Sequence, residues 1–268
     1  MNPRLACLAC LEREPVALLE ATLWIAAEHD PVVEPADGLV QVRELQREIS
    51  SNLPLLPLHE LAQPLLRQLN ALGFQQDDYH PLRPQVALMD KVLQRRRGQP
   101  LPLAILALEL AQRLSIPLEG VNFPGHFLLR VPGADHLLDP CGGRRLYPVD
   151  CRELLARQFG PQLTLNAEHL RSASPMQMLQ RLSRNLRQLH SSNDNDLAAL
   201  VDAERVMQLG PAQVGDYLAR ATLYQHLDCP QAERFDLEHA LLLTDDPLQR
   251  LKLGERLGQI PNGKRSIH

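Results

Sequence analysis

The segment from Gly98 to Pro117, "GQPLPLAILALELAQRLSIP", restricts the fold more than any other part of the sequence. Its apolar side chains recur at the i, i+3, i+4, i+7 spacing of one helix face, and Ile105 and Leu108 make most of the opposite side apolar too. Pro102 suits the first turn of a helix, where its missing N–H has no intrahelical partner. A helix that is apolar nearly all round needs neighbours on every side, so this segment predicts the central helix of a domain.

The composition favours a helical protein with about two domains. A length of 268 residues is long for one compact core. Hydrophobic residues make up 44% of the sequence but aromatic residues only 4%, so the core must be built mainly from Leu, Ala and Val, which favours packed helices. Amphipathic patterns before the central helix predict four more helices, at about residues 15–30, 39–49, 59–72 and 85–98. We expect the last of these to end with Gly98 in the left-handed conformation.

After Pro117 the pattern changes to the alternation of strands. The stretches "LEGVNF", "HFLLRV" and "HLLDP" read as strands, and "PGAD" reads as the turn between the second and the third. That turn sets Leu128 opposite Asp139. His126 shares a face with Leu128, so His126 and Asp139 are predicted to project from one face as neighbours. A shift of one residue in this register would separate them.

The sequence from about residue 173 is predicted to be entirely helical and to contain a repeat. A shift of 34 residues matches Asp194 with Asp228 and Asp202 with Asp236, among other pairs. A period of about 34 residues is typical of tetratricopeptide repeats, each a pair of helices, although most of their Trp, Gly and Tyr landmarks are absent. We expect one helical pair, a second pair, and a short capping helix at about residues 248–257. Chance similarity between helices is the alternative.

Charge and cysteine content exclude several classes of function. The net charge of −4 and the few aromatic residues argue against a nucleic-acid partner. Five irregularly spaced cysteines indicate a reducing compartment, and the Cys7–Cys10 pair lacks the second CxxC or the His pair of a metal site. No apolar stretch reaches the length of a membrane span, and the N-terminus does not resemble a signal peptide. We therefore expect a soluble cytoplasmic protein without a metal or other cofactor.

A buried helix, then a strand with His126, then a strand with Asp139 is the order of parts in papain-like acyl-transfer sites. The motifs "RRRGQP", "FPGHFLLR" and "LDPCGG" resemble those of the transglutaminase-like domain of the bacterial SirB-type family, whose members carry C-terminal tetratricopeptide repeats. The resemblance covers nearly the whole sequence. It implies an α+β fold, with a papain-like core in residues 1–172 and an all-α repeat region in residues 173–268.

Compared with active members of the family it resembles, the sequence lacks the catalytic cysteine. Active transglutaminase-like enzymes have Cys at the start of the central helix, whereas residues 98–103 here are Gly, Gln, Pro, Leu, Pro and Leu. His126 and Asp139 match the family's remaining His and Asp positions and form a vestigial pair. Two interpretations of this pair stay open: a structural link between strands, or part of a cleft that still binds a peptide or an acyl group. A metal held by His126, His136 and Asp139 is less favoured, because the two histidines need not share a face.

Cys141 could restore a nucleophile, since the hairpin register would place it opposite His126. Against this, Cys141 has no helix N-terminus to stabilise a thiolate, and a small buried Cys is an ordinary core residue. The sequence therefore favours a non-catalytic interaction or regulatory protein that binds a protein or peptide through its helical repeats and its vestigial cleft. The alternative is a papain-like thiol hydrolase or acyltransferase that uses His126, Asp139 and Cys141. The sequence determines neither the partner nor the oligomeric state.

Overall fold

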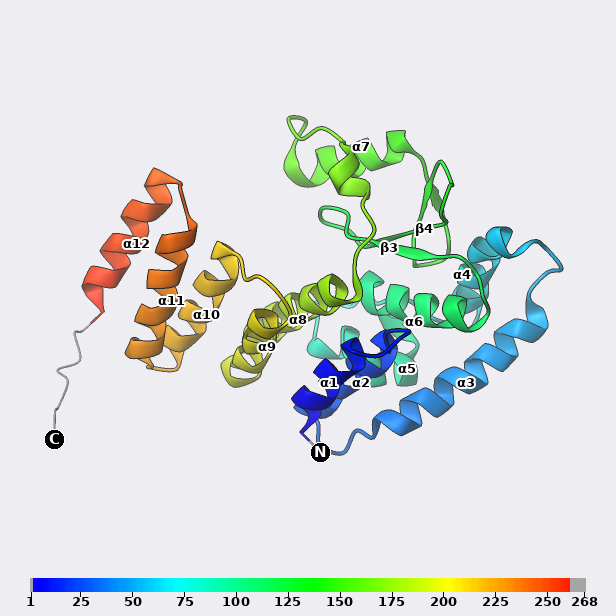
Figure 1. Ribbon diagram of the computed structural model, residues 1–268, viewed down its shortest axis with the longest axis horizontal. Helices are drawn as coiled ribbons and strands as arrows, with labels where there is room; N and C mark the ends of the chain where they lie inside the picture. The colour runs from blue at the N-terminus through cyan, green and yellow to red at the C-terminus, as the bar shows by residue number, and fades with distance from the viewer. Residues whose placement is uncertain (1, 261–268) are drawn as a thin grey trace. The chain divides into compact units, whose positions relative to one another are not determined.

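The computed structural model describes residues 2–260, and the protein forms two compact units, one up to Leu182 and one from Ser183 onward. The first unit combines helices with a small sheet, and the second is helical (Figure 1). The division falls inside α8 (Pro175–Ser191), a helix that begins two residues after position 173, where the sequence changes character.

The first unit begins with helices that surround a central one. Five α-helices precede the centre: α1 (Pro3–Leu11), α2 (Leu18–His29), α3 (Pro35–Asn52), α4 (Ala62–Ala71) and α5 (Met89–Arg95). Short 3-10 turns lie at Leu58–Glu60 and Pro84–Val86. The helix α6 (Pro100–Arg113) contacts α2, α3, α4 and α5, and every residue from 101 to 107 is buried. The prediction of a central helix is confirmed, although α6 begins at Pro100 rather than at Pro102.

The predicted helix over residues 85–98 is wrong at its C-terminal end. The helix α5 stops at Arg95, and Arg96, not Gly98, adopts the left-handed conformation, with φ of 55°. Arg97–Gly98 forms the strand β2, which pairs in parallel with β1 (Gln75–Gln76). Glycine is needed at position 98 because the backbone there packs closely against Val92 of α5: a Cβ would lie 2.8 Å from Cγ2 of Val92. A local pattern cannot reveal that contact.

A four-stranded antiparallel meander follows α6. Its strands are β3 (Glu119–Val121), β4 (Leu128–Arg130), β5 (Leu137–Leu138) and β6 (Arg145–Leu146), in that spatial order. Leu129 pairs with Leu138, which confirms the predicted register. The strands are shorter than predicted, and β6 was not predicted at all.

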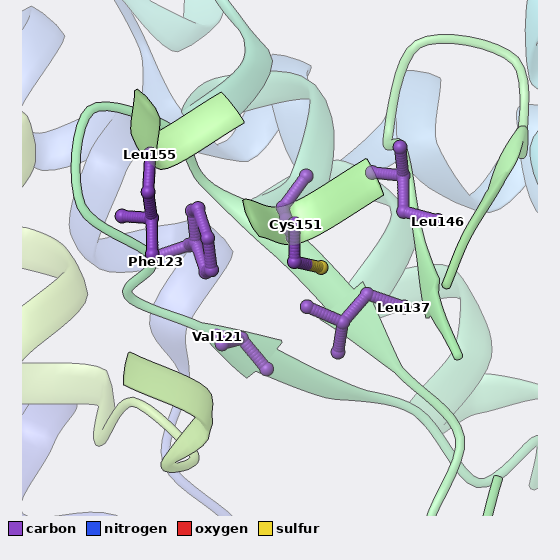
Figure 2. Close-up of a cluster of buried hydrophobic side chains, with 7 residues drawn as sticks. Val121, Phe123, Leu137, Leu146, Cys151 and Leu155 are labelled. Atoms are coloured by element: carbon purple, nitrogen blue, oxygen red, sulfur yellow. The ribbon is translucent and has the colours of Figure 1, made fainter. Parts of the chain in front are cut away.

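The sheet lies between two helical layers. The helix α6 packs on β3 and β4, whereas α7 (Pro148–Phe159) lies on the other side of the sheet (Figure 1). Cys151 and Leu155 of α7 point toward Val121, Phe123 and Leu137 and form one buried cluster with them (Figure 2). This cluster holds the loop between β3 and β4, on which His126 lies, against the core.

The second unit contains the predicted helical repeat. Up to residue 260, the helices that lie wholly within this unit are α9 (Asp196–Gln208), α10 (Val214–His226), α11 (Pro230–Leu243) and α12 (Pro247–Gln259). The helices α9 and α11 begin 34 residues apart. Each follows an Asp with positive φ, 56° at Asp194 and 53° at Asp228. The self-similarity in sequence therefore reflects a real structural repeat, and α12 occupies the place of the expected capping helix.

Candidate functional site

The start of α6 is where a papain-like enzyme would carry its nucleophile. Gln99 is the N-cap residue, and its N–H donates to the carbonyl oxygen of Val86 at 2.7 Å. The next residues, Pro100 to Leu103, carry neither a thiol nor a hydroxyl group, and residues 101–103 are buried. The positive end of the helix dipole at this point therefore meets no group that could become a thiolate.

His126 lies at the end of a turn before β4, not inside the predicted strand. Its backbone N–H donates to the carbonyl oxygen of Phe123 at 3.0 Å, and its half-buried imidazole lies 6.5 Å from the Phe123 ring, centroid to centroid. Burial lowers the pKa of His126, and the positive charge of Arg181 lowers it further, whereas Asp139 opposes both effects. The imidazole is therefore neutral at pH 7.

Asp139 stabilises the turn between β5 and β6. Its Oδ1 accepts the backbone N–H of Cys141 at 2.8 Å. Its backbone N–H donates to the carbonyl oxygen of Arg144, and its carbonyl oxygen accepts the N–H of Gly143. Gly143 has φ of 73° and leaves no room for a side chain beside Leu66 of α4. Within residues 2–260, no hydrogen bond joins Asp139 to His126, so its carboxylate acts on the imidazole only through space.

Cys141 lies beyond the strand pairing from which it was predicted to face His126. The β4–β5 ladder ends at Leu138, because the backbone then enters the turn that Asp139 holds, so the register cannot be extended to Cys141. Burial raises the pKa of the Cys141 thiol to about 12, helped by the negative charges of Asp139 and Asp78. The strand pairing behind the predicted Cys–His pair therefore does not reach Cys141, and the pair stays a prediction.

Arg181 is the charged residue at this site that sequence reasoning missed. It lies on α8, within the first unit, and its Nη1 donates to the carbonyl oxygen of Phe123 at 3.2 Å and to Oδ1 of Asn122 at 2.5 Å. Its guanidinium lies over the Phe127 ring, 5.8 Å from the centroid. Arg181 is 58 residues from Phe123 along the sequence, and no local pattern indicates this contact.

The residues considered for a metal are spread along the sheet. His136 lies at the hairpin end of the β4–β5 pair, where its Nδ1 is 2.9 Å from Oδ1 of Asp135. His126 precedes β4 at the opposite end of that pair. The fold therefore does not bring His126, His136 and Asp139 together around one point.

Comparisons with known proteins agree with this architecture. Residues 37–184 match the transglutaminase-like superfamily, and residues 186–258 match the tetratricopeptide repeat. The sequence is 60% identical over 270 residues to a UPF0162 protein of Pseudomonas aeruginosa, with full coverage of both proteins. It is 27% identical over 227 residues to the UPF0162 protein YchA of Escherichia coli, covering 82% of this protein and 83% of that one.

A eukaryotic relative shares part of the sequence. F-box only protein 21 of Homo sapiens is 31% identical over 207 residues, which is 71% of this protein but 31% of that one. Between residues 2 and 260, no helix combines the length and the apolar character that crossing a membrane requires.

The protein belongs to the transglutaminase-like superfamily, within the bacterial UPF0162 proteins, and continues into tetratricopeptide repeats.

Proposed function

We propose that this is a non-catalytic interaction or regulatory protein of the cytoplasm, akin to the SirB-type proteins, in which a degenerate transglutaminase-like core is joined to partner-binding helical repeats. The observation that carries the proposal is the start of α6, which offers no nucleophile at Pro100 to Leu103. Removing the nucleophile of such a triad costs on the order of a million-fold in turnover.

The remaining groups do not compensate for that loss. A thiolate–imidazolium pair requires a Cys with a low pKa and a His with a raised pKa. The pKa values of Cys141 and His126 are shifted in the opposite directions. Asp139 uses one carboxylate oxygen to hold the turn rather than to orient the imidazole.

The second unit offers apolar surface for a partner. Leu242 at the end of α11 is 81% exposed, and Leu248 and Leu251 of α12 are 70% and 61% exposed. Helical repeats present extended surfaces for partner helices or peptides, and exposed leucines are favourable contacts for such an interface. We propose these three leucines as part of the partner-binding surface.

The partner-binding role is tested by crosslinking the full-length protein in cells. The wild type is compared with the triple variant Leu242→Gln, Leu248→Gln, Leu251→Gln, and the matched control is Leu55→Gln, which alters a fully exposed leucine of the first unit. The proposal expects one or more crosslinked proteins that the triple variant loses and the control keeps. Identical crosslinked species in all three would overturn it.

The alternative function is a thiol hydrolase or acyltransferase that uses Cys141. It predicts turnover of activated esters or amides by the wild type, abolished both in Cys141→Ser and in His126→Ala while each variant remains folded by circular dichroism. The non-catalytic proposal expects no turnover above the buffer rate. Turnover that depends on both side chains would replace the proposal with the alternative.

A further inference from the structure

Arg181 is held in a fixed position by neutral groups. Its Nη1 hydrogen bonds reach the carbonyl oxygen of Phe123 and the Oδ1 of Asn122, and the Phe127 ring lies under the guanidinium plane. Phe127 is itself buried, and its ring packs closely on β3, since its Cζ would lie 2.7 Å from a Cβ placed at Gly120. The side chain of Arg181 is therefore pre-organised, and little rotamer freedom is left to lose on binding.

No carboxylate of the described residues forms an ion pair with Arg181, in contrast to other arginines of the protein. Arg130 pairs with Glu119 at 2.7 Å, and Arg220 pairs with Asp236 at 2.6 Å. Burial without a nearby anion lowers the pKa of Arg181. A partly buried cation whose only partners are neutral costs free energy, and a ligand anion would offset that cost.

One edge of the guanidinium is available to such a ligand. Both hydrogen bonds of Arg181 use Nη1, so within residues 2–260 Nε and Nη2 have no protein acceptor. Neither atom is among the buried polar atoms that lack a partner, so both are reachable from solvent. Two parallel N–H groups along one guanidinium edge match the two oxygens of a carboxylate.

The other polar groups at this place suit a single negative charge. The imidazole of His126 is close enough for its pKa to be lowered by the charge of Arg181, and Asn122 is exposed beside the guanidinium. Asp139, the anion that acts on His126, is committed to the β5–β6 turn and forms no ion pair with Arg181. One cation with neutral donors around it fits a carboxylate better than a dianionic phosphate.

We propose that Arg181 and His126 form a carboxylate-binding site, through which the degenerate core takes a peptide by one of its carboxylate groups. This deepens the proposed function by naming a ligand chemistry for the degenerate core, and it rests on that proposal only in taking the core to bind rather than to catalyse. The carboxylate comes from an acidic residue of the peptide or from its C-terminus, and the experiment separates these sources.

The experiment is a titration of the full-length protein followed by the NMR signals of the His126 ring. The probes are N-acetyl-glutamate amide, whose only carboxylate is the γ-carboxylate, N-acetyl-alanine, whose only carboxylate is the terminal one, and inorganic phosphate. A bound carboxylate neutralises Arg181, so the proposal expects at least one carboxylate probe to saturate the His126 shifts and to raise the pKa of His126. The stronger carboxylate probe identifies the source.

Two variants and a matched control decide the role of Arg181. Arg181→Gln should weaken carboxylate binding at least about tenfold. Arg181→Lys should recover only part of that affinity, because Lys keeps the charge but lacks the two parallel N–H groups of the guanidinium edge. Arg157→Gln removes the same charge from an exposed site on α7 and should bind as the wild type does. Should Arg181→Gln fail to fold, Asn122→Ala, at an exposed position, should still weaken binding by releasing Nη1.

The proposal is overturned if no carboxylate probe moves the His126 signals, if Arg181→Gln binds as tightly as the wild type, or if phosphate alone binds. These failures leave the proposed function intact, since that function is judged by turnover and by crosslinking through the repeats. Conversely, ester or amide turnover would refute the proposed function, while carboxylate binding at Arg181 could still be measured.

Discussion

Cys141 is the residue whose chemistry departs furthest from what an active thiol enzyme needs. With its pKa raised to about 12, the thiol should resist alkylation at neutral pH, because only the thiolate attacks. We expect Cys229 to be alkylated first, because its side chain is exposed to the reagent. Asp139→Asn removes a negative charge and should make Cys141 more reactive. Peptide mapping of iodoacetamide adducts measures both, and fast labelling of Cys141 at pH 7 would contradict the assignment.

His126 makes a pH-dependent contribution to stability. Its folded-state pKa lies below the ordinary value of 6.5, so the unfolded protein binds a proton more readily than the folded one. The contribution is therefore fully present above about pH 6.5 and is lost as the pH falls through the folded-state pKa.

His126→Gln removes this titration. The difference in unfolding free energy between the wild type and His126→Gln should shrink between about pH 7.5 and pH 5, measured by urea denaturation. Arg181→Gln should raise the pKa of His126, because the guanidinium repels the imidazolium. A difference that stays constant, or that grows, as the pH falls would show that the pKa of His126 is not lowered.

Among the elements, the junction between α5 and α6 depends on close packing at Gly98. A Cβ there would lie 2.8 Å from Cγ2 of Val92 and 3.1 Å from the carbonyl oxygen of Val86, which also accepts the N–H of Gln99. Gly98→Ala should lower the free energy of unfolding by about 1–3 kcal/mol through overpacking. Gly254→Ala is the control, because its Cβ meets nothing within 4 Å and Ala favours a helix. Equal stabilities of the two variants would contradict the steric account.

The repeat helices are joined by a buried ion pair. Asp236 of α11 is fully buried and receives two hydrogen bonds from Arg220 of α10, at 2.8 and 2.6 Å. Asp236→Asn should cost about 2 kcal/mol, less than the loss of a fully buried pair, because part of the Arg220 guanidinium can still reach water. Glu238→Gln removes the same charge from the exposed face of α11 and should change stability little.

At the scale of the whole molecule, we propose that the two compact units unfold as separate domains. Trp24, the single tryptophan, lies on α2 of the first unit, so its fluorescence reports that unit alone. Asp236→Asn should lower the midpoint of the circular dichroism transition of the second unit and leave the Trp24 transition unchanged. A common shift of both signals would show one cooperative unit instead.

The sequence by itself determined the features that depend on residues close together along the chain. The all-round apolar pattern placed α6 at the centre, the four-residue turn set Leu129 opposite Leu138, and the 34-residue period located the paired helices of the second unit. The absence of a nucleophile from residues 98–103, at the start of α6, was also readable from the sequence, since it needs only residue identities.

Only the tertiary structure decided which side chains share an environment. Arg181 reaches Phe123 across 58 residues, Gly98 is required by contacts with Val92 and Val86, and Cys141 lies beside Asp139. The spacing of apolar residues in a helix or a strand shows only which side chains of that one segment share a face. Burial and the charges around a group depend on segments brought together from distant parts of the sequence, and these set the chemistry of the site.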